Sequence, residues 1–149
     1  MSKSHWGFKK KKVHKSKRSL SEKMSNLFII ATTLLVLHGV EEYLTGFFKV
    51  DPIFLFLFSP FETMTVFQST FLLFQICLLL AFIAFHMLLR GGKAVLILFG
   101  VIGFFLFFEV HHIVEAVIVG GYYPGLVTAL LLPIVGFFFW KELIRNWKH

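Results

Sequence analysis

Cysteine and charge are both scarce in this chain of 149 residues. Cys77 is the only cysteine, which excludes an internal disulfide and a cysteine-ligated metal cluster. It lies in an apolar run, where a buried and inert thiol is expected. Charged residues make up 15% of the chain, against about 25% in soluble domains, whereas hydrophobic residues make up 57%. This shortage of charge indicates a membrane protein, and the length suits a single domain.

Four apolar runs are long enough to cross a bilayer, which takes about 20 residues of helix. They cover approximately residues 27–46, 60–89, 94–119 and 124–140. We predict an all-α polytopic membrane protein, with a four-helix transmembrane bundle over residues 26–141 and tails at 1–25 and 142–149. The stretch 47–58 is too short to cross and too apolar for an ordinary loop. It is predicted to be an interfacial or re-entrant segment between helices 1 and 2.

Local signals refine the ends of these helices. Ser59, Pro60 and Glu62 form a capping-box pattern that predicts the start of the second span. Pro124 is expected at the start of the fourth span. Pro133 is expected to kink that span, because proline lacks a backbone N–H.

The basic residues predict the orientation of the chain. Nine of the 15 Lys and Arg residues precede Leu27, two lie between the second and third spans, and three follow the fourth span. Lys49 alone falls on the other side. The positive-inside rule therefore predicts a multi-pass cell-membrane protein with both termini in the cytoplasm. The basic N-terminal tail is expected to contact anionic lipid, at about 1 kcal/mol per basic residue, and this explanation is preferred over nucleic-acid binding.

Ionisable side chains interrupt the first and third spans, although each charged group costs roughly 2.5–3.5 kcal/mol at a helix centre. They are His38, Glu41 and Glu42 in the first span and Glu109, His111, His112 and Glu115 in the third. Each set falls on or beside one stripe of its helix. Both spans run in the same direction, so the stripes should lie at one depth. We expect a polar group of one stripe within about 6 Å of the other, close enough to share a metal ion.

A literal H-x-x-E-E occurs in the first span, as HGVEE from His38 to Glu42. With the four-span pattern and the run HHIVEA, the chain resembles the HXXEE-motif family of small integral membrane proteins over roughly Leu27 to Trp140. The resemblance implies a multi-span helical protein and leaves the activity open.

Imidazole and carboxylate together are ligands of zinc and of non-haem iron or manganese. Glu109-x-x-His112 has the Glu-x-x-His spacing of di-iron carboxylate bundles, whereas the first span has the reverse order. The expected metal ligands are His38, Glu41, Glu42, Glu109, His112 and Glu115. Glu42 and His111 are also expected as catalytic residues that move protons. Thr45, Gln68 and Gln75 are expected as polar neighbours of the ligands.

The pattern favours a metal-dependent enzyme that acts on a lipid or another apolar substrate. Three alternatives stay open at this point. A metal-free isomerase or hydrolase of lipids would use carboxylates with separated pKa values. A proton or cation transporter would use the same residues as a relay. A buried polar knot would only fix helix packing.

Overall fold

The computed structural model describes residues 20–148, and this part of the chain is all-helical. Four helical segments in it are long and apolar enough to cross a membrane, which confirms the predicted fold class. They are α1 (Glu22–Thr45), α3 (Val66–Arg90), α4 with α5 (Lys93–Phe108 and Val110–Val119), and α6 with α7 (Leu126–Ala129 and Leu132–Lys148). Most of the predicted basic tail, residues 1–19, lies outside the described residues, as does His149.

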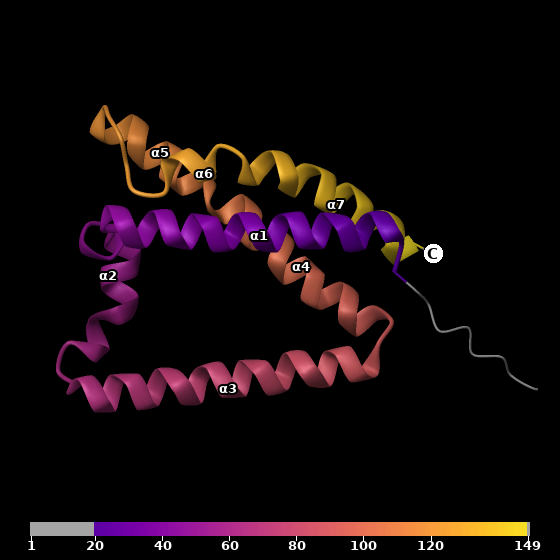
Figure 1. Ribbon diagram of the computed structural model, residues 1–149, viewed down its shortest axis with the longest axis horizontal. Coiled ribbons are helices and arrows are strands. Elements are labelled where there is room, and N and C mark those ends of the chain that lie inside the picture. The colour runs from indigo at the N-terminus through magenta and orange to yellow at the C-terminus, as the bar shows by residue number, and fades with distance from the viewer. Residues whose placement is uncertain (1–19, 149) are drawn as a thin grey trace, which may run out of the picture.

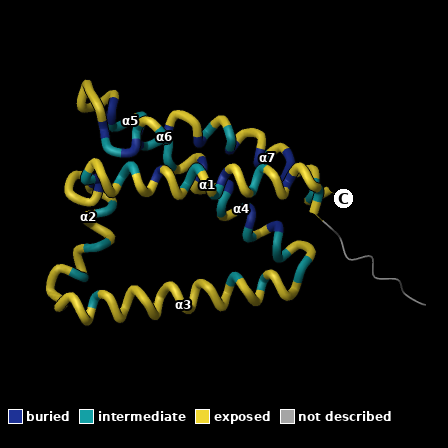
Figure 2. The backbone as a smooth tube through the Cα atoms, in the orientation of Figure 1, coloured by how far each residue is buried: buried dark blue, intermediate teal, exposed yellow. Residues whose placement is uncertain are grey.

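Three of the segments form the packed part of the molecule. α1, α4 and α7 contact one another, whereas α3 packs mainly against α4 and stands apart from α1 and α7 (Figure 1). Buried positions gather on α1, α4, α5 and α7, and no residue of α3 is buried (Figure 2). The buried apolar core consists of Met24, Ala31, Leu96, Phe99, Leu106, Leu132, Phe139 and Leu143.

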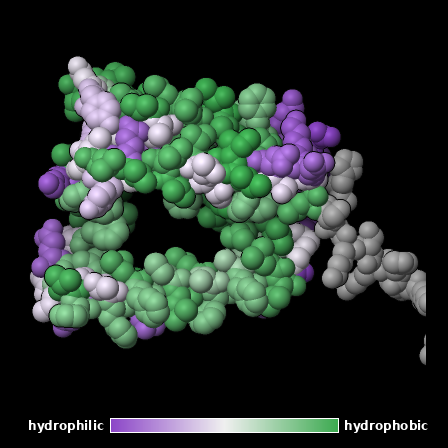
Figure 3. Space-filling view, in the orientation of Figure 1, coloured by the Kyte–Doolittle hydropathy of each residue, from purple (hydrophilic) through white to green (hydrophobic). Residues whose placement is uncertain are grey.

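The separation of α3 leaves most of its side chains exposed. Figure 3 shows an opening between α3 and the rest of the molecule, surrounded by apolar side chains. Cys77 is exposed on this helix, not buried as the sequence suggested. An apolar run does not distinguish burial in protein from exposure to hydrocarbon, because both environments favour the same side chains.

α1 begins and α7 ends at the same end of the bundle. The Ser21 hydroxyl donates to Glu142 at 2.8 Å, and the Ser21 backbone N–H donates to Asn146 at 3.2 Å. These bonds join two helix ends that were expected to be tails. α1 therefore begins at Glu22 and not near residue 27, and the last helix continues to Lys148.

The capping box predicted at Ser59 does not form. Residues Ser59–Phe61 make a 3-10 turn, η2, in which the Ser59 hydroxyl donates to the Phe56 carbonyl at 2.9 Å. α3 instead begins after Thr65, which forms a capping box with Gln68. Both spacings fit a capping box, but only the second leads directly into the long apolar run of α3.

The third and fourth spans each contain a break. α4 ends at Phe108 and α5 begins at Val110, so Glu109 lies at the junction. α6 ends at Ala129, whose carbonyl would accept the bond that Pro133 is unable to donate. The predicted kink is therefore present. Breaks at membrane depth are tolerated where protein surrounds them, and both breaks lie close to the polar residues described below.

Residues 47–58 fold into the 3-10 turn η1 (Phe47–Lys49) and the short helix α2 (Pro52–Phe58). Asp51 caps α2 by accepting the Phe54 N–H at 2.7 Å. α2 runs crosswise between the end of α1 and the start of α3, an orientation typical of interfacial helices (Figure 1).

Candidate metal centre

Two imidazoles and two carboxylates converge between α1 and the α4–α5 junction. They belong to His38, Glu42, Glu109 and His112, and one ligand atom from each lies within 4.8 Å of all the others. Both histidines are buried and both glutamates are half-buried. The two polar stripes therefore meet, within the distance expected from the sequence.

The distances among the four ligand atoms suit a single metal ion. The Nε2 atoms of His38 and His112 lie 3.1 Å apart, and they lie 3.1 and 3.2 Å from Glu109 Oε2. Glu42 Oε1 lies 3.2 Å from His112 Nε2 and 3.6 Å from His38 Nε2. Ligands placed about 2.0–2.1 Å from a tetrahedral ion lie about 3.3 Å from one another. An ion fits among these atoms with little rearrangement.

A hydrogen bond on the side of His112 away from the cluster determines which ring nitrogen faces the cluster. Its Nδ1 lies 2.6 Å from the Pro124 carbonyl oxygen. A carbonyl only accepts hydrogen bonds, so Nδ1 carries the hydrogen. In the neutral imidazole, Nε2 then presents its lone pair to the cluster.

His38 is oriented in the same way by Thr128 and Glu41. The Thr128 hydroxyl donates to Glu41 Oε2 at 2.6 Å, so it accepts from His38 Nδ1 at 2.7 Å. Glu41 also accepts the backbone N–H groups of Val127 and Thr128, at 3.0 and 2.9 Å, and the Tyr122 hydroxyl at 2.9 Å. Glu41 was expected among the ligands, but the structure places it one layer behind His38.

This arrangement concentrates electron pairs at one point. Two neutral imidazoles whose Nε2 atoms lie 3.1 Å apart repel each other unless a positive charge lies between them. The two carboxylates beside them add two negative charges. One divalent cation balances both effects, and an imidazole with a hydrogen-bond partner on its far nitrogen is the usual form of a metal ligand. Two extra protons are the metal-free alternative.

Gly125 allows the backbone to pass directly beside both imidazoles. Its φ is +85°, a conformation that L side chains rarely adopt. A Cβ atom here would lie 2.8 Å from ring atoms of both His112 and His38. The loop before α6 therefore fits against the cluster only with glycine at this position.

A second polar group borders the cluster and was missed in the sequence. Asp51 is 2% exposed and accepts a hydrogen bond from the Tyr123 hydroxyl at 3.0 Å. Burial and the bond to Asp51 raise the pKa of Tyr123, which keeps its hydroxyl protonated. His111 lies 3.8 Å from Asp51 and 3.9 Å from Glu109. The Asp-Pro pattern marks Asp51 as a helix cap, but no local signal places it beside α5.

The other predicted residues lie outside the cluster. Glu115 is half-buried and forms no hydrogen bond or ion pair within residues 20–148. The Thr45 hydroxyl donates to the backbone carbonyl of Glu41 at 2.7 Å. Gln68 caps α3, and Gln75 is exposed on the same helix. Neither glutamine reaches the cluster, because α3 packs mainly against α4.

Residues 28–139 match a family model described as "Protein of unknown function with HXXEE motif". The chain belongs to the HXXEE-motif family. No curated protein and no solved structure matches it. In this HXXEE-motif protein, the three residues of the motif form two layers. His38 and Glu42 point into the cluster, and Glu41 orients His38 through Thr128.

Proposed function

We propose that this protein is a membrane metalloenzyme that holds one divalent transition-metal ion and acts on a lipid or another apolar substrate. The ligands are His38, Glu42, Glu109 and His112. The observation that carries this proposal is the orientation of the two imidazoles: each donates its Nδ1–H outward and turns its Nε2 to the same point. With both imidazoles neutral, the two Nε2 lone pairs and the two carboxylates face one another as four acceptors, and a divalent cation at that point satisfies all four.

The ligand set restricts the metal. Two imidazole nitrogens and two carboxylate oxygens suit zinc, iron and manganese. Five of the six ligand pairs lie between 3.1 and 3.6 Å apart, close to the spacing around a four-coordinate ion such as zinc, and the sixth pair, Glu42 and Glu109, lies within 4.8 Å.

A pocket of about 150 Å³ adjoins the cluster, and its lining favours an apolar substrate. Glu42, Glu109, Asp51 and His111 form its polar side. Its other walls are apolar and come from Phe47, Ile53, Phe54, Leu57 and Phe108. A substrate with an apolar chain would place its polar group against the carboxylates. A bound metal ion would supply Lewis-acid chemistry there, by polarising an oxygen atom or lowering the pKa of a water.

Both residues that were expected to be catalytic remain candidates in this pocket. Glu42 and His111 both line it, so each is positioned to exchange a proton with a bound molecule. Asp51, on the wall of the same pocket, accepts the hydrogen bond from the Tyr123 hydroxyl.

Proton or cation transport is less well supported. A transporter needs a polar path from the cluster toward the end of the bundle that carries the termini. Buried apolar side chains, among them Phe99, Leu106 and Phe139, fill that part of the described bundle.

The location in the membrane is also a proposal. The distribution of basic residues favours a cell-membrane protein with both termini in the cytoplasm. The bonds between Ser21 and α7 support an even number of crossings, because they hold the start of α1 beside the end of the last span.

The metal content of the purified protein tests the proposal. We expect about one transition-metal ion per chain in detergent, measured by inductively coupled plasma mass spectrometry. Chelation should lower the melting temperature, and the metal should restore it, because an ion that binds only the folded state stabilises that state. A wild-type protein that holds no metal and takes up neither zinc, iron nor manganese would support the acid–base alternative.

The same preparation tests the enzymatic part. Metal-loaded protein in vesicles of extracted membrane lipid should convert at least one lipid species that the chelated protein leaves unchanged, as measured by mass spectrometry. If the protein holds the metal but no lipid changes, the site is a structural metal centre.

Thr128→Val tests the layer behind the ligands. Valine keeps the shape of the side chain but removes the hydroxyl that links Glu41 to His38. Loss of such an outer partner should weaken metal affinity by about 10-fold to 100-fold, measured by competition with a chelating dye. Thr45→Val is the matched control, because that hydroxyl donates to a backbone carbonyl and forms no bond to His38. Equal affinities in the two variants would show that Thr128 does not orient His38.

A further inference from the structure

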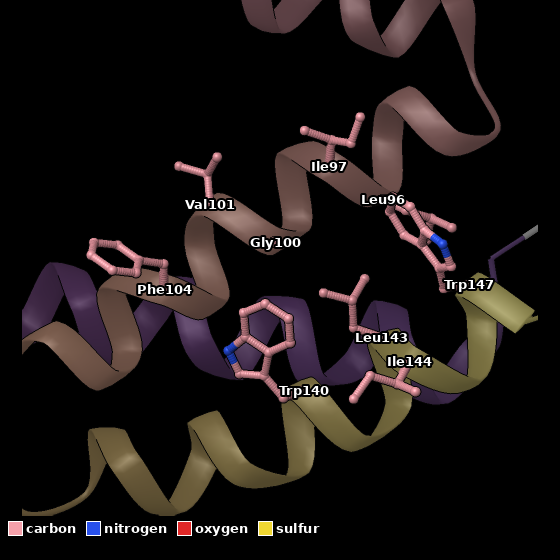
Figure 4. A pocket seen from close by; sticks show the side chains of 9 residues that line it. All are labelled: Leu96, Ile97, Gly100, Val101, Phe104, Trp140, Leu143, Ile144 and Trp147. Atoms are coloured by element: carbon pink, nitrogen blue, oxygen red, sulfur yellow. The ribbon is translucent and has the colours of Figure 1, made fainter.

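An apolar groove runs between α4 and α7, on a part of the molecule that the metal centre does not use. Its volume is about 520 Å³. The residues that line it include Ile97, Gly100 and Phe104 on α4 and Trp140, Ile144 and Trp147 on α7 (Figure 4). Several of these large side chains are about half exposed, so the groove is open along its length.

Each of the two helices that form the groove carries a lysine just beyond the lining residues, at the same end of the groove. On α4, Lys93 precedes the lining residue Leu96 by three positions. On α7, Lys148 follows the lining residue Ile144 by four positions. Residues three and four apart share a helix face, so both lysines lie on the stripes that form the walls. Leu96 near the start of α4 and Trp147 near the end of α7 both line the groove, so the helix spacing puts both lysines toward one mouth of it.

We propose that this groove binds one acyl chain of an anionic phospholipid, with the phosphate of the headgroup between Lys93 and Lys148. The lining is apolar, as a hydrocarbon chain requires. Both lysines are exposed, and neither forms an ion pair within residues 20–148. Basic residues at the end of a pocket between membrane helices are a recognised arrangement for anionic headgroups. Trp147 lies at the same mouth, as interfacial tryptophans do.

Charge also argues against a second copy of the chain as the occupant. Copies with the same membrane orientation are related by a two-fold axis along the membrane normal. A dimer through this groove would therefore bring the lysines of both copies together at one depth. A lipid phosphate neutralises Lys93 and Lys148, whereas a second copy adds to their repulsion.

Gly100 provides a way to close the groove without disturbing the fold. A Cβ atom at Gly100 would have no atom within 4 Å, so a larger side chain can extend into open space. Gly100→Leu should fill the groove where an acyl chain would lie. Ala81→Leu is the matched control, because it places the same side chain on the exposed surface of α3.

Fluorescence quenching tests the proposal in a Trp6→Phe background, where Trp140 and Trp147 are the remaining tryptophans. The protein is reconstituted in vesicles of dibrominated phosphatidylcholine, which quenches both indoles, and unbrominated phosphatidylglycerol is then added. Fluorescence should recover at a mole fraction of phosphatidylglycerol about 25-fold lower than that of unbrominated phosphatidylcholine, since each of the two lysines contributes about fivefold to headgroup binding.

Two variants, each with a control, test the headgroup contact and the acyl-chain contact separately. Lys93→Gln with Lys148→Gln should remove the preference for phosphatidylglycerol, whereas Lys49→Gln with Lys141→Gln should keep it. Gly100→Leu should abolish the preference, and Ala81→Leu should retain it, with helix content checked by circular dichroism. Equal recovery with both lipids in the unmodified protein would overturn the proposal. So would a dimer that Gly100→Leu dissociates, because the groove would then be a protein interface.

Discussion

His38→Ala and His112→Ala should each abolish stoichiometric metal binding. Each Nε2 atom lies 3.1–3.6 Å from the other three ligand atoms, so removing either one opens a side of the site that no other described side chain fills. The loss of affinity should exceed the roughly 100-fold that removal of an outer partner costs. Metal content after purification and competition with a chelating dye both measure it.

His86→Ala is the matched control for these two variants. His86 is exposed on α3, away from the cluster, so the control removes an imidazole of the same membrane protein without changing the site. With chelator present, the His38 and His112 variants should melt close to the chelated wild type, because the metal no longer contributes to any of them. Variants that keep a full complement of metal would refute the assigned ligands.

Gly125→Ala should cause a larger loss of stability than Gly120→Ala. The residue has a φ of +85°, and its new Cβ atom would lie 2.8 Å from both imidazoles. The left-handed backbone costs about 1–2 kcal/mol for alanine, and overpacking costs about 1–3 kcal/mol more. Thermal melting in detergent measures the loss. The metal should be lost as well, because both rings are displaced from the point at which they converge.

Gly120→Ala separates the two causes of this effect. Gly120 has a φ of +67°, but a Cβ atom there would have no atom within 4 Å. It therefore shares the backbone cost with Gly125 and lacks the contact with the imidazoles. Only Gly125→Ala should lose metal. If the two variants lose metal and stability to the same extent, close contact with the cluster is not the reason for glycine at position 125.

The sequence by itself predicted the long helices and the level along the bundle at which the two polar stripes meet. Length and composition predicted four membrane-length helices, because apolar runs of about 20 residues are specific to that architecture. The 3.6-residue period placed His38 and Glu42 on one face of α1, and Glu109 and His112 on one face of the third span. The expected parallel direction of these two spans then predicted that the two faces meet, and they do.

Only the tertiary structure decided which of these polar residues meet in the cluster. Glu41 and Glu42 are neighbours on α1, yet Glu42 joins the cluster and Glu41 binds the start of α6. Asp51, which caps α2, lines the pocket beside the cluster, whereas Gln75 on α3 does not. Periodicity fixes the angles between residues on one helix, but not the rotation of that helix about its axis or the choice of its neighbours. Those are set by packing between segments far apart in the chain, which local sequence does not encode.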